Sequence, residues 1–422
     1  MVLKMRKMKD SGIEWIGMIP EGWEVCRLKN IVACHDELRK PISADKRENH
    51  LKLYDYYGAS GVIDTIDDYN VDGTVLLIGE DGANLKLRNL PLIYRASGKF
   101  WVNNHAHILI VNKKYSYDYV AYLLEAGDYS NYITGSAQPK LSQFNLMRFP
   151  VAIPNYTEQE NISFFIHREC SKIDSILSET RSSIEEYKKL KQAVITQAVT
   201  KGVRGEREMK DSGVEWIGEI PKEFDSVQLK FFCKLITDGT HFSPNTVETG
   251  LPYITAGDVH GIGLDYNSAK RISEDDFQLL VAQGCQPLKG DVLLVKDGAT
   301  TGRVGFVDSD TPCVILSSVA MLRPADKTDG HYLMYLLASD FLQKQILVSM
   351  AGSAMPRTTL TKLTKYIGLL PPLYEQKEIA NYLDAKCAEI DRLIAKKEQL
   401  VKELESYKKS LIYEVVTGKR KV

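Results

Sequence analysis

Two long stretches of the chain carry apolar residues at steps that alternate between three and four positions. The first runs from about Glu158 to about Thr200, and the second from about Glu375 to Val416. This spacing is typical of a helix that packs along another helix, and neither Gly nor Pro interrupts it. At 1.5 Å per residue the first helix would be about 60 Å long, too long for one small core to enclose. We therefore predict that the two helices pack against each other as an antiparallel coiled coil.

The second stretch is a copy of the first. Ile173-Asp174 recurs as Ile390-Asp391, and Val199-Thr200 recurs as Val416-Thr417, both 217 positions later. An ordinary buried helix would explain one apolar stripe, but the charged outer faces and the second copy favour paired helices. Some apolar residues fall outside the shared stripe, and we expect them to contact another protein: Phe164, Phe165 and Ile195.

Each helix follows a globular part that opens with the same ten-residue sequence motif; we call each such recurring motif a word. The word Met8-Lys-Asp-Ser-Gly-Ile-Glu-Trp-Ile-Gly17 returns 201 positions later as Met209-Lys-Asp-Ser-Gly-Val-Glu-Trp-Ile-Gly218. Short β-rich runs, such as Val75–Ile78 and Val292–Val295, alternate with turns rich in Gly, Asn and Asp. We predict an α+β fold with two pseudo-two-fold-related globular α/β domains, each followed by a long helix. The expected domains are residues 1–156, a helical region 157–203, residues 204–373, and a helical region 374–422.

Two shorter words also recur in the globular parts. Leu-Leu-Ile-Gly-Glu-Asp81-Gly-Ala matches Leu-Leu-Val-Lys-Asp297-Gly-Ala, and Gly135-Ser-Ala-Gln-Pro-Lys140 matches Gly352-Ser-Ala-Met-Pro-Arg357. A repeat of this length is a domain duplication and not a solenoid. The Gly and Pro of the second word are expected to hold a loop, with Lys140 and Arg357 near phosphate.

The chain ends resemble the junction between the two halves. Val199-Thr-Lys-Gly202 leads through a short polar link into Met209, whereas Val416-Thr-Gly-Lys419 is near the C-terminus and Met8 is near the N-terminus. The ends therefore look like the middle junction with its link cut. We predict that the two termini lie close together if the middle junction is compact.

Composition narrows the class of protein. The 422 residues favour two or three domains, and 44% hydrophobic with 26% charged residues is typical of a globular chain. Seven cysteines without CxxC spacing indicate reduced thiols and a cytoplasmic location, and no signal peptide or membrane span is apparent. A net charge of −1 gives no global excess of basic residues, but a balanced chain can still present a locally basic face.

Catalytic motifs are missing from the sequence. There is no phosphate-binding loop, no HExxH, no GxSxG and no GxGxxG after a strand. The Asn/Asp-Pro-Pro-aromatic motif of amino-methyltransferases is missing too. We therefore expect no catalytic residue, no metal site and no cofactor on this chain.

Candidate binding residues cluster near turns. Arg, Lys, Asn, Gln, His and short hydroxyl side chains suit base edges and phosphates, because they donate and accept hydrogen bonds in the right geometry. A solvated polar face is the alternative for any one of them. The DNA-binding candidates are Asn84, Lys86, Arg88, Arg95, Lys99, Asn103, Asn104, His105, Gln138 and Lys140 in the first half, and Asp238, Thr240, His241, Lys296, Thr300, Thr301, Arg303 and Arg357 in the second.

The combination of words resembles the specificity (S) subunit of type I restriction-modification systems. The resemblance rests on the repeated Trp-Ile-Gly…Ile-Pro start, the Gly-Ser-Ala-x-Pro loop, and Pro371-Pro-Leu-Tyr-Glu-Gln at a helix start. Asp238-Gly-Thr-His241 with Tyr253-Ile-Thr-Ala-Gly-Asp258 resembles the opening of many target-recognition domains. The first helix start departs from the pattern, with Ile-Pro-Asn-Tyr-Thr-Glu-Gln in place of the Pro-Pro-Leu form.

The resemblance implies a non-catalytic subunit with two target-recognition domains. Each domain would read one half of a bipartite DNA site across a fixed unread spacer. The helices would recruit two modification subunits, which carry S-adenosylmethionine and methylate adenine N6, and restriction subunits would join them. Two alternatives stay open: a stand-alone bipartite DNA-binding regulator, which would bind without partners, and a coiled-coil scaffold, which would bind protein only.

Overall fold

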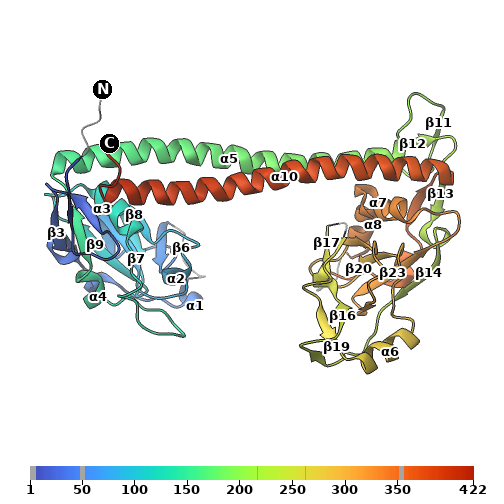
Figure 1. Cartoon of the computed structure of the whole chain (residues 1–422), viewed down its shortest axis with the longest axis horizontal. Coiled ribbons are helices and arrows are strands. Elements are labelled where there is room, and N and C mark those ends of the chain that lie inside the picture. The colour runs from blue at the N-terminus through green and yellow to red at the C-terminus, as the bar shows by residue number, and fades with distance from the viewer. Residues whose placement is uncertain (1–5, 48–52, 216, 262, 351–355) are drawn as a thin grey trace. The chain divides into compact units, whose positions relative to one another are not determined.

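A computed structural model describes residues 6–47, 53–215, 217–261, 263–350 and 356–422. The chain divides into two compact units. Unit 1 comprises Met1–Thr180 with Gln399–Val422, and unit 2 comprises Arg181–Glu398. Each unit therefore contains one globular domain and a part of both long helices (Figure 1).

Unit 1 is built on a six-stranded sheet with the order β4-β9-β7-β8-β5-β6. Neighbouring strands are antiparallel except β5 and β8, which are parallel. The central strand β7 contains the run Val75–Ile78, and all four of its side chains are buried, two on each face. The sheet strands are β4 (Val32–Cys34), β5 (Tyr54–Gly58), β6 (Gly61–Ile66), β7 (Val71–Gly79), β8 (Ile93–Val102) and β9 (Ala106–Val111).

Short elements surround this sheet. Helix α3 starts at the N-cap Ser116, whose hydroxyl accepts from the backbone N–H of Tyr119, and α4 starts in the same way at Ser142. The remaining elements of unit 1 are β1 (Met8–Asp10), β2 (Met18–Pro20), β3 (Glu24–Arg27), β10 (Pro150–Ile153), η1 (Leu28–Asn30), η2 (Asp36–Leu38), α1 (Ala44–Arg47), α2 (Asn84–Leu87), α3 (Tyr117–Ala126) and α4 (Gln143–Met147).

Unit 2 repeats the core of that sheet and adds a second one. The four-stranded order β14-β23-β20-β21 matches β4-β9-β7-β8, and the second sheet has the order β15-β19-β16-β22. The elements are β11 (Met209–Asp211), β12 (Glu219–Pro221), β13 (Asp225–Gln228), η3 (Leu229–Phe231), β14 (Cys233–Asp238), β15 (Thr246–Val247), β16 (Leu251–Ile254), η4 (Ala256–Asp258), β17 (Val259–His260), β18 (Gly263–Leu264), β19 (Lys270–Ile272), α6 (Glu274–Ala282), β20 (Val292–Val295), β21 (Val304–Phe306), β22 (Val314–Ile315), β23 (Val319–Pro324), α7 (Gly330–Ala338), α8 (Asp340–Ser349), α9 (Leu360–Leu363) and β24 (Ile367–Leu370).

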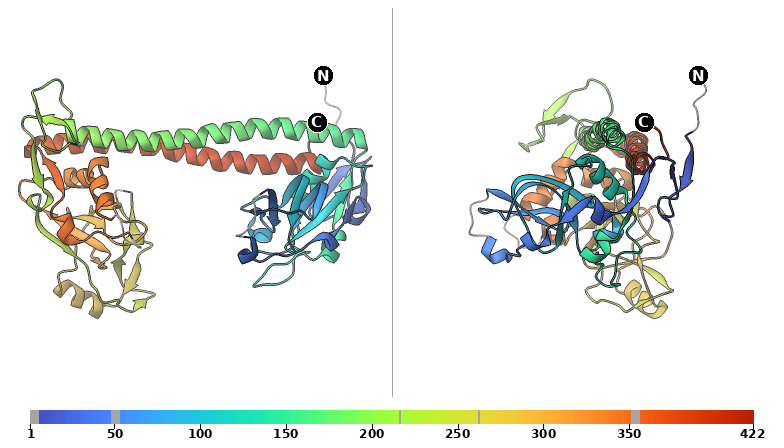
Figure 2. Two further views of the ribbon diagram at one scale, coloured as in Figure 1. Left: turned by 180° about the vertical axis from the view of Figure 1, so that it is seen from behind. Right: turned by 90° about the vertical axis from the view of Figure 1, so that its left-hand side faces the viewer.

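The predicted helices are α5 (Tyr156–Lys201) and α10 (Leu373–Val416). In unit 1, Asp174 on α5 pairs with Lys408 on α10 at 2.6 Å, and Phe165 lies under the Arg420 guanidinium just beyond α10. In unit 2, Lys191 pairs with Asp391 at 2.6 Å, and Tyr187 lies under the Lys397 ammonium. In both units residue numbers rise on one helix as they fall on the other, so the predicted antiparallel coiled coil is confirmed (Figures 1 and 2).

The two helix–helix ion pairs are copies with the partners exchanged. Asp174 and Asp391 occupy equivalent positions of the repeat, and so do Lys191 and Lys408. Asp174 on α5 therefore pairs with Lys408 on α10, and its repeat equivalent on α10, Asp391, pairs with the equivalent of Lys408 on α5, Lys191. This exchange is what a two-fold relation between the halves requires at the level of contacts.

Segments beside the two chain ends meet in unit 1, as the repeat predicts. The Tyr413 hydroxyl donates to the carbonyl of Trp15 at 2.8 Å. Gly418 ends the exit of α10 in the left-handed region with φ +73°, and Gly202 does the same after α5, also with φ +73°. A Cβ at Gly418 would lie 2.4 Å from Pro20. The exit of α10 therefore packs against the start of the first globular domain, at Trp15 and Pro20.

The repeated Glu-Gln pair explains how each long helix is attached to its domain. Glu158 pairs with Arg6, and the equivalent Glu375 pairs with Arg207 at 2.6 Å. The neighbouring Gln159 accepts from the backbone N–H of Ser116, which caps α3. Gln376 makes the same bond to Asp329, the N-cap of α7, and it is fully buried.

The expectation for the residues outside the helical stripe needs one correction. Phe164 is 68% exposed, but Ile195 is only 3% exposed and belongs to the core of unit 2. Phe165 is half-buried beneath the guanidinium groups of Arg168 and Arg420. Ile195 is therefore unavailable to a partner. No helix within the described parts of the chain is long and apolar enough to cross a membrane.

Candidate nucleic-acid interface

The two recurring words of each globular domain contact each other. In unit 1 the turn after β7 meets the loop before α4: the N–H of Gly82 donates to the carbonyl of Pro139 at 3.0 Å, and the N–H of Leu141 donates to the carbonyl of Glu80 at 2.7 Å. The Lys140 ammonium lies 3.0 Å from the Glu80 carboxylate. We call this contact the loop clasp.

Unit 2 contains the same loop clasp. The N–H of Gly298, in the turn after β20, donates to the carbonyl of Pro356 at 3.0 Å. The Arg357 guanidinium lies 2.9 Å from the Asp297 carboxylate. The other residues of this word, 352–355, lie outside the described residues. The clasp explains why these words recur while the sequence around them differs, because each word holds the other in place.

Charged side chains surround the clasp in unit 1. Arg39 bridges Glu80 at 2.5 Å and Asp36 at 3.2 Å, and His105 lies 2.8 Å from Asp81. Burial acts to raise the pKa of Glu80, but hydrogen bonds from Arg39 and Lys140 outweigh it, so the pKa is lowered. Glu80 is therefore ionised at neutral pH and holds two cations at the turn.

In unit 2 a buried lysine takes the central place. Lys296 is 3% exposed, and its ammonium lies 2.8 Å from Asp297 and 3.3 Å from Asp238. A buried ammonium requires such partners, because an unpaired charge in the interior is costly. His241 is 3.7 Å from Asp238 and is largely exposed. Lys296 therefore holds Asp297, the residue of the clasp that also pairs with Arg357, and Asp238 holds Lys296 in turn. His241 faces solvent.

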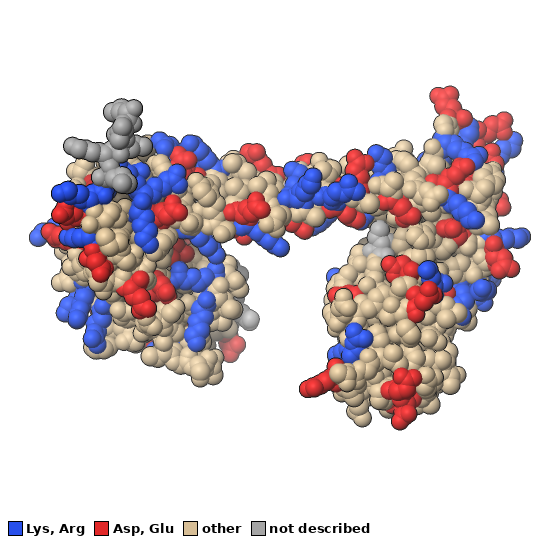
Figure 3. Space-filling view, in the orientation of Figure 1, with Lys and Arg blue, Asp and Glu red and all other residues tan. Residues whose placement is uncertain are grey.

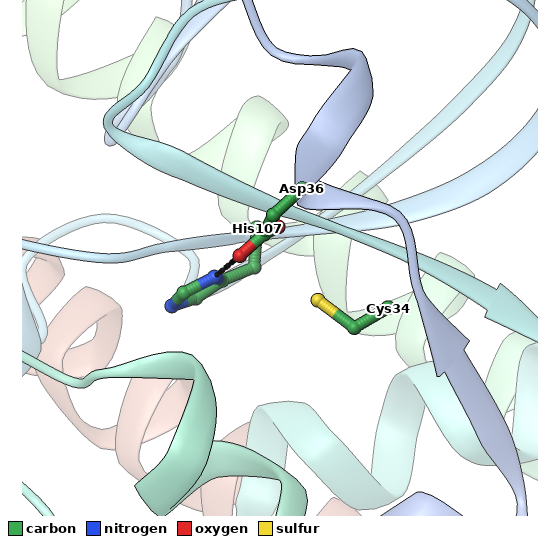
Figure 4. Close-up of side chains that lie close together, drawn as sticks. All are labelled: Cys34, Asp36 and His107. Carbon is green, nitrogen blue, oxygen red and sulfur yellow. Dashed lines mark hydrogen bonds and ion pairs between the residues drawn. The ribbon is translucent and has the colours of Figure 1, made fainter.

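Cys34, Asp36 and His107 lie close enough to hold a cation, with ligand atoms within 4.8 Å of one another (Figure 4). Both nitrogens of His107 already have partners, however: Nδ1 is 2.7 Å from Asp36, and Nε2 is 2.8 Å from the carbonyl of Leu141. Burial, followed by the charge of Asp36, raises the pKa of the Cys34 thiol to about 12. The thiolate that a metal needs is therefore disfavoured, and the cluster ties the loop clasp to the sheet.

The remaining candidates of unit 1 divide by their contacts. Asn84 bonds the backbone of Leu90 and Pro91. Arg88, with φ +51°, donates to the carbonyls of Glu125 and Gly127. These side chains hold their own loop.

Other candidates of unit 1 have different surroundings. Arg95 pairs with Asp118 and stacks on Tyr122. Asn103 is buried, and Lys99 lies over the Tyr69 ring. The exposed candidates of unit 1 without a described side-chain partner are Lys86, Asn104 and Gln138.

In unit 2, Thr240 is 4% exposed and bonds the backbone of Phe242. Thr301 donates to Gly298 and Pro356 at the clasp, so it supports the loop. Thr300 is half-buried, and Arg303 is exposed. Arg357 pairs with Asp297 yet keeps 61% of its side chain exposed, and Lys140 keeps 54%. Both side chains can therefore reach a ligand from within the clasp.

Sequence reasoning missed Arg39, Glu80 and Asp36, and it interpreted His107 only as a plain hydrogen-bonding residue. Glu80 stood inside a recurring word, which was a usable signal. Asp36 and His107 are 71 positions apart on different elements, and no spacing rule joins them. On the face drawn in Figure 3, unit 1 carries many Lys and Arg side chains mixed with Asp and Glu. In unit 2 the charged side chains gather on and beside the helices, and the lower part of its globular domain is mostly uncharged there.

The fold and these loops define a tandem protein: two sheet domains, each with a clasped pair of loops and a long helix. The family described as type I restriction modification DNA specificity domain matches residues 20–186 and 221–404. The chain therefore belongs to this family, as a specificity subunit that is not itself an enzyme but a component of a type I restriction-modification complex.

Individual relatives agree with the family. The Type I restriction enzyme MjaVIII specificity subunit of Methanocaldococcus jannaschii is 24% identical over 100% of this chain and 99% of its own length. The putative MjaX specificity subunit of the same organism is 25% identical over 96% of each chain. A solved structure, from work on complex assembly and conformational transition of the type I R-M system, has a TM-score of 0.69 at 15% identity, covering 94% of this chain and 98% of that one.

Proposed function

We propose that each globular domain reads one half of a bipartite DNA site and that a fixed number of unread bases separates the halves. The observation that carries this proposal is the loop clasp, which occurs at the same place in both domains with an exposed cation at its edge, Lys140 or Arg357. Phosphate contacts fix register and base-edge contacts give specificity, so a loop held by backbone hydrogen bonds, with neighbouring side chains that differ between the two domains, suits both tasks.

The residues that we assign to base or phosphate contact are the exposed candidates. In unit 1 these are Lys86, Arg95, Lys99, Asn104, His105, Gln138 and Lys140, and in unit 2 His241, Arg303 and Arg357; to these we add Thr300, which is half-buried. The remaining candidates position these loops.

The partners of the complex follow from the same proposal. The paired helices recruit two modification subunits, which bring S-adenosylmethionine and methylate adenine N6, and restriction subunits join to cleave unmodified DNA. Phe164 on α5 is 68% exposed and is the apolar side chain that we assign to such a contact. Because the substrate is DNA, the complex works in the cytoplasm.

The test is the pattern of methylated adenines in cells that carry this chain with its modification subunit. Two half-sites with a constant gap are expected, and exchanging unit 2 for another domain should change one half-site only. Purified chain with S-adenosylmethionine should transfer no methyl group to DNA, and adding the modification subunit should restore transfer.

Other outcomes would favour the two alternatives. Sequence-selective DNA binding by the chain without any partner would favour a stand-alone regulator. Assembly with the modification subunit but no DNA selectivity would favour a protein scaffold.

A further inference from the structure

Three basic residues recur at equivalent places in both globular domains. They are Lys29, Lys114 and Arg148 in unit 1, and Lys230, Lys327 and Lys365 in unit 2. We call each set a basic triad. The members of a triad are far apart in sequence, so their position depends on the fold.

In unit 1, backbone hydrogen bonds bring the three segments together. The N–H of Leu28 donates to the carbonyl of Phe149 at 2.9 Å, which places Lys29 and Arg148 on adjacent segments. The N–H of Asn112 donates to the carbonyl of Ile31 at 2.9 Å, which brings the turn with Lys114 to the same place.

The equivalent bonds occur in unit 2. The N–H of Leu229 donates to the carbonyl of Tyr366 at 2.7 Å, and the N–H of Ala325 donates to the carbonyl of Phe232 at 2.9 Å. Lys230 itself donates from its backbone to Thr364 at 3.2 Å. The two triads therefore occupy the same corner of each domain.

The charges of the triads are not used inside the protein. All six side chains are exposed, and none lies within ion-pair distance of a carboxylate among the residues that the structure describes. Arg148 lies over the ring of Phe144 at 4.9 Å, and Lys230 lies over the ring of Phe231 at 5.0 Å. Exposed cations without an ion-pair partner add little to stability, and an exposed cation–π contact adds only about 0.5–1 kcal/mol, so stability does not explain why all six recur.

The neighbourhood shows that only the triad is common to both domains. In unit 1, Arg27 and Lys113 extend the basic surface, but the equivalent residues of unit 2 are Gln228 and Asp326. Loops that read different bases are expected to differ between the domains. A surface that keeps three charges through that divergence is suited to a ligand that is the same for both, whatever the sequence read.

We propose that each basic triad binds phosphates of the DNA backbone and thereby positions its domain on the duplex. This inference rests on the proposed function. Phosphate is the part of DNA that does not vary with sequence, and lysine binds it as a point charge. The net charge of the chain is −1, so attraction to DNA must come from local groups such as these.

The test compares triple variants of the full chain, assembled with the modification subunit, on cognate and unrelated duplexes over a range of salt concentration. Each phosphate contact contributes about 0.9 to the slope of log K against log salt, so K29A/K114A/R148A and K230A/K327A/K365A should each flatten the slope by up to about 2.7. Both duplexes should be weakened alike, and the methylated bases should not change.

Two controls separate charge from folding. The variant K9A/K234A/K270A removes three exposed lysines that lie outside the long helices, the triads and the loop clasps, and it should leave the slope unchanged. The variant K29R/K114R/R148K keeps the charges and should bind DNA as the unmodified chain does.

Three results would overturn the proposal: an unchanged slope in both triple variants, a changed base preference, or loss of the modification subunit with normal DNA binding by the complexes that remain. The last result would assign the triads to a protein partner. If the complex without substitutions shows no preference for any DNA sequence, it is the proposed function that fails, and not the assignment of the triads.

Discussion

At the scale of single residues, the least predictable feature is the charged interior beneath the loop clasp of unit 1. His107 is 0% exposed, and its ring nitrogens face the Asp36 carboxylate and the Leu141 carbonyl. These two contacts hold the ring in place, so a hydrogen-bonded Asp–His pair lies behind the loop that we assign to DNA.

The pKa of Asp36 leads to a prediction about pH. Burial acts to raise this pKa, but hydrogen bonds from His107 and Cys34 and the charge of Arg39 outweigh it, so the folded-state pKa is lowered. A lowered carboxyl pKa stabilises the fold above the unfolded value of about 3.9, and this contribution is lost as pH falls through the folded pKa. Asp36→Asn should therefore cost about 1–3 kcal/mol of unfolding free energy at pH 7, and the cost should become smaller as the pH falls toward 3.

Urea titrations at both pH values, followed by tryptophan fluorescence, check this prediction. Asp45→Asn on the short exposed helix α1 is the matched control and should have little effect at either pH. An equal loss of stability for Asp36→Asn at both pH values would contradict the role assigned to its charge.

At the scale of elements, the long helices are held by their apolar stripe more than by ion pairs. Leu383 is 0% exposed, whereas the Lys191–Asp391 pair leaves 51% of the Asp391 side chain exposed. Leu383→Ala should cost about 2–5 kcal/mol. Lys191→Ala should cost at most about 1 kcal/mol.

Circular dichroism during thermal unfolding checks this comparison, with Lys402→Ala on the exposed side of α10 as the control. Equal losses for Leu383→Ala and Lys191→Ala would contradict the assignment to packing.

The elements also show what sequence could and could not predict. The helices were predictable because a three-four spacing sustained over forty or so residues has few other solutions. The strand order β4-β9-β7-β8-β5-β6 was not predictable. The neighbours β4 and β9 are far apart in sequence, and short apolar runs like theirs occur in many strands, so their sequences do not show which strand pairs with which. The loop clasp could be predicted in part. The recurring words marked both loops, but nothing in the words showed that they contact each other. Asn84 and Arg88 have the side chains of DNA readers, yet their hydrogen bonds hold their own loop.

At the scale of the whole molecule, the exchanged ion pairs predict how half a chain behaves. A fragment of residues 1–206 lacks Lys408 but contains its equivalent, Lys191. Two copies of the fragment can therefore pair Asp174 of one with Lys191 of the other, twice. We predict a dimer that, with the modification subunit, directs methylation to an inverted repeat of the first half-site.

Light scattering and methylation mapping check the state of the fragment. Asp174→Lys should weaken the dimer, and the double variant D174K/K191D should restore it, because opposite charges then face each other again. A fragment that stays monomeric and directs no methylation would contradict the two-fold relation.

The Glu-Gln attachment has a consequence for how such a protein changes over generations. Glu158 and Gln159 fasten one domain by the same bonds that Glu375 and Gln376 use for the other. A gene that exchanges the coding segment between the opening word and the helix start would install a new reading surface without disturbing the attachment. Under the proposed function, one crossover on each side of that segment would give a cell a new pattern of self-marking on its chromosome, while the rest of the machinery is inherited unchanged.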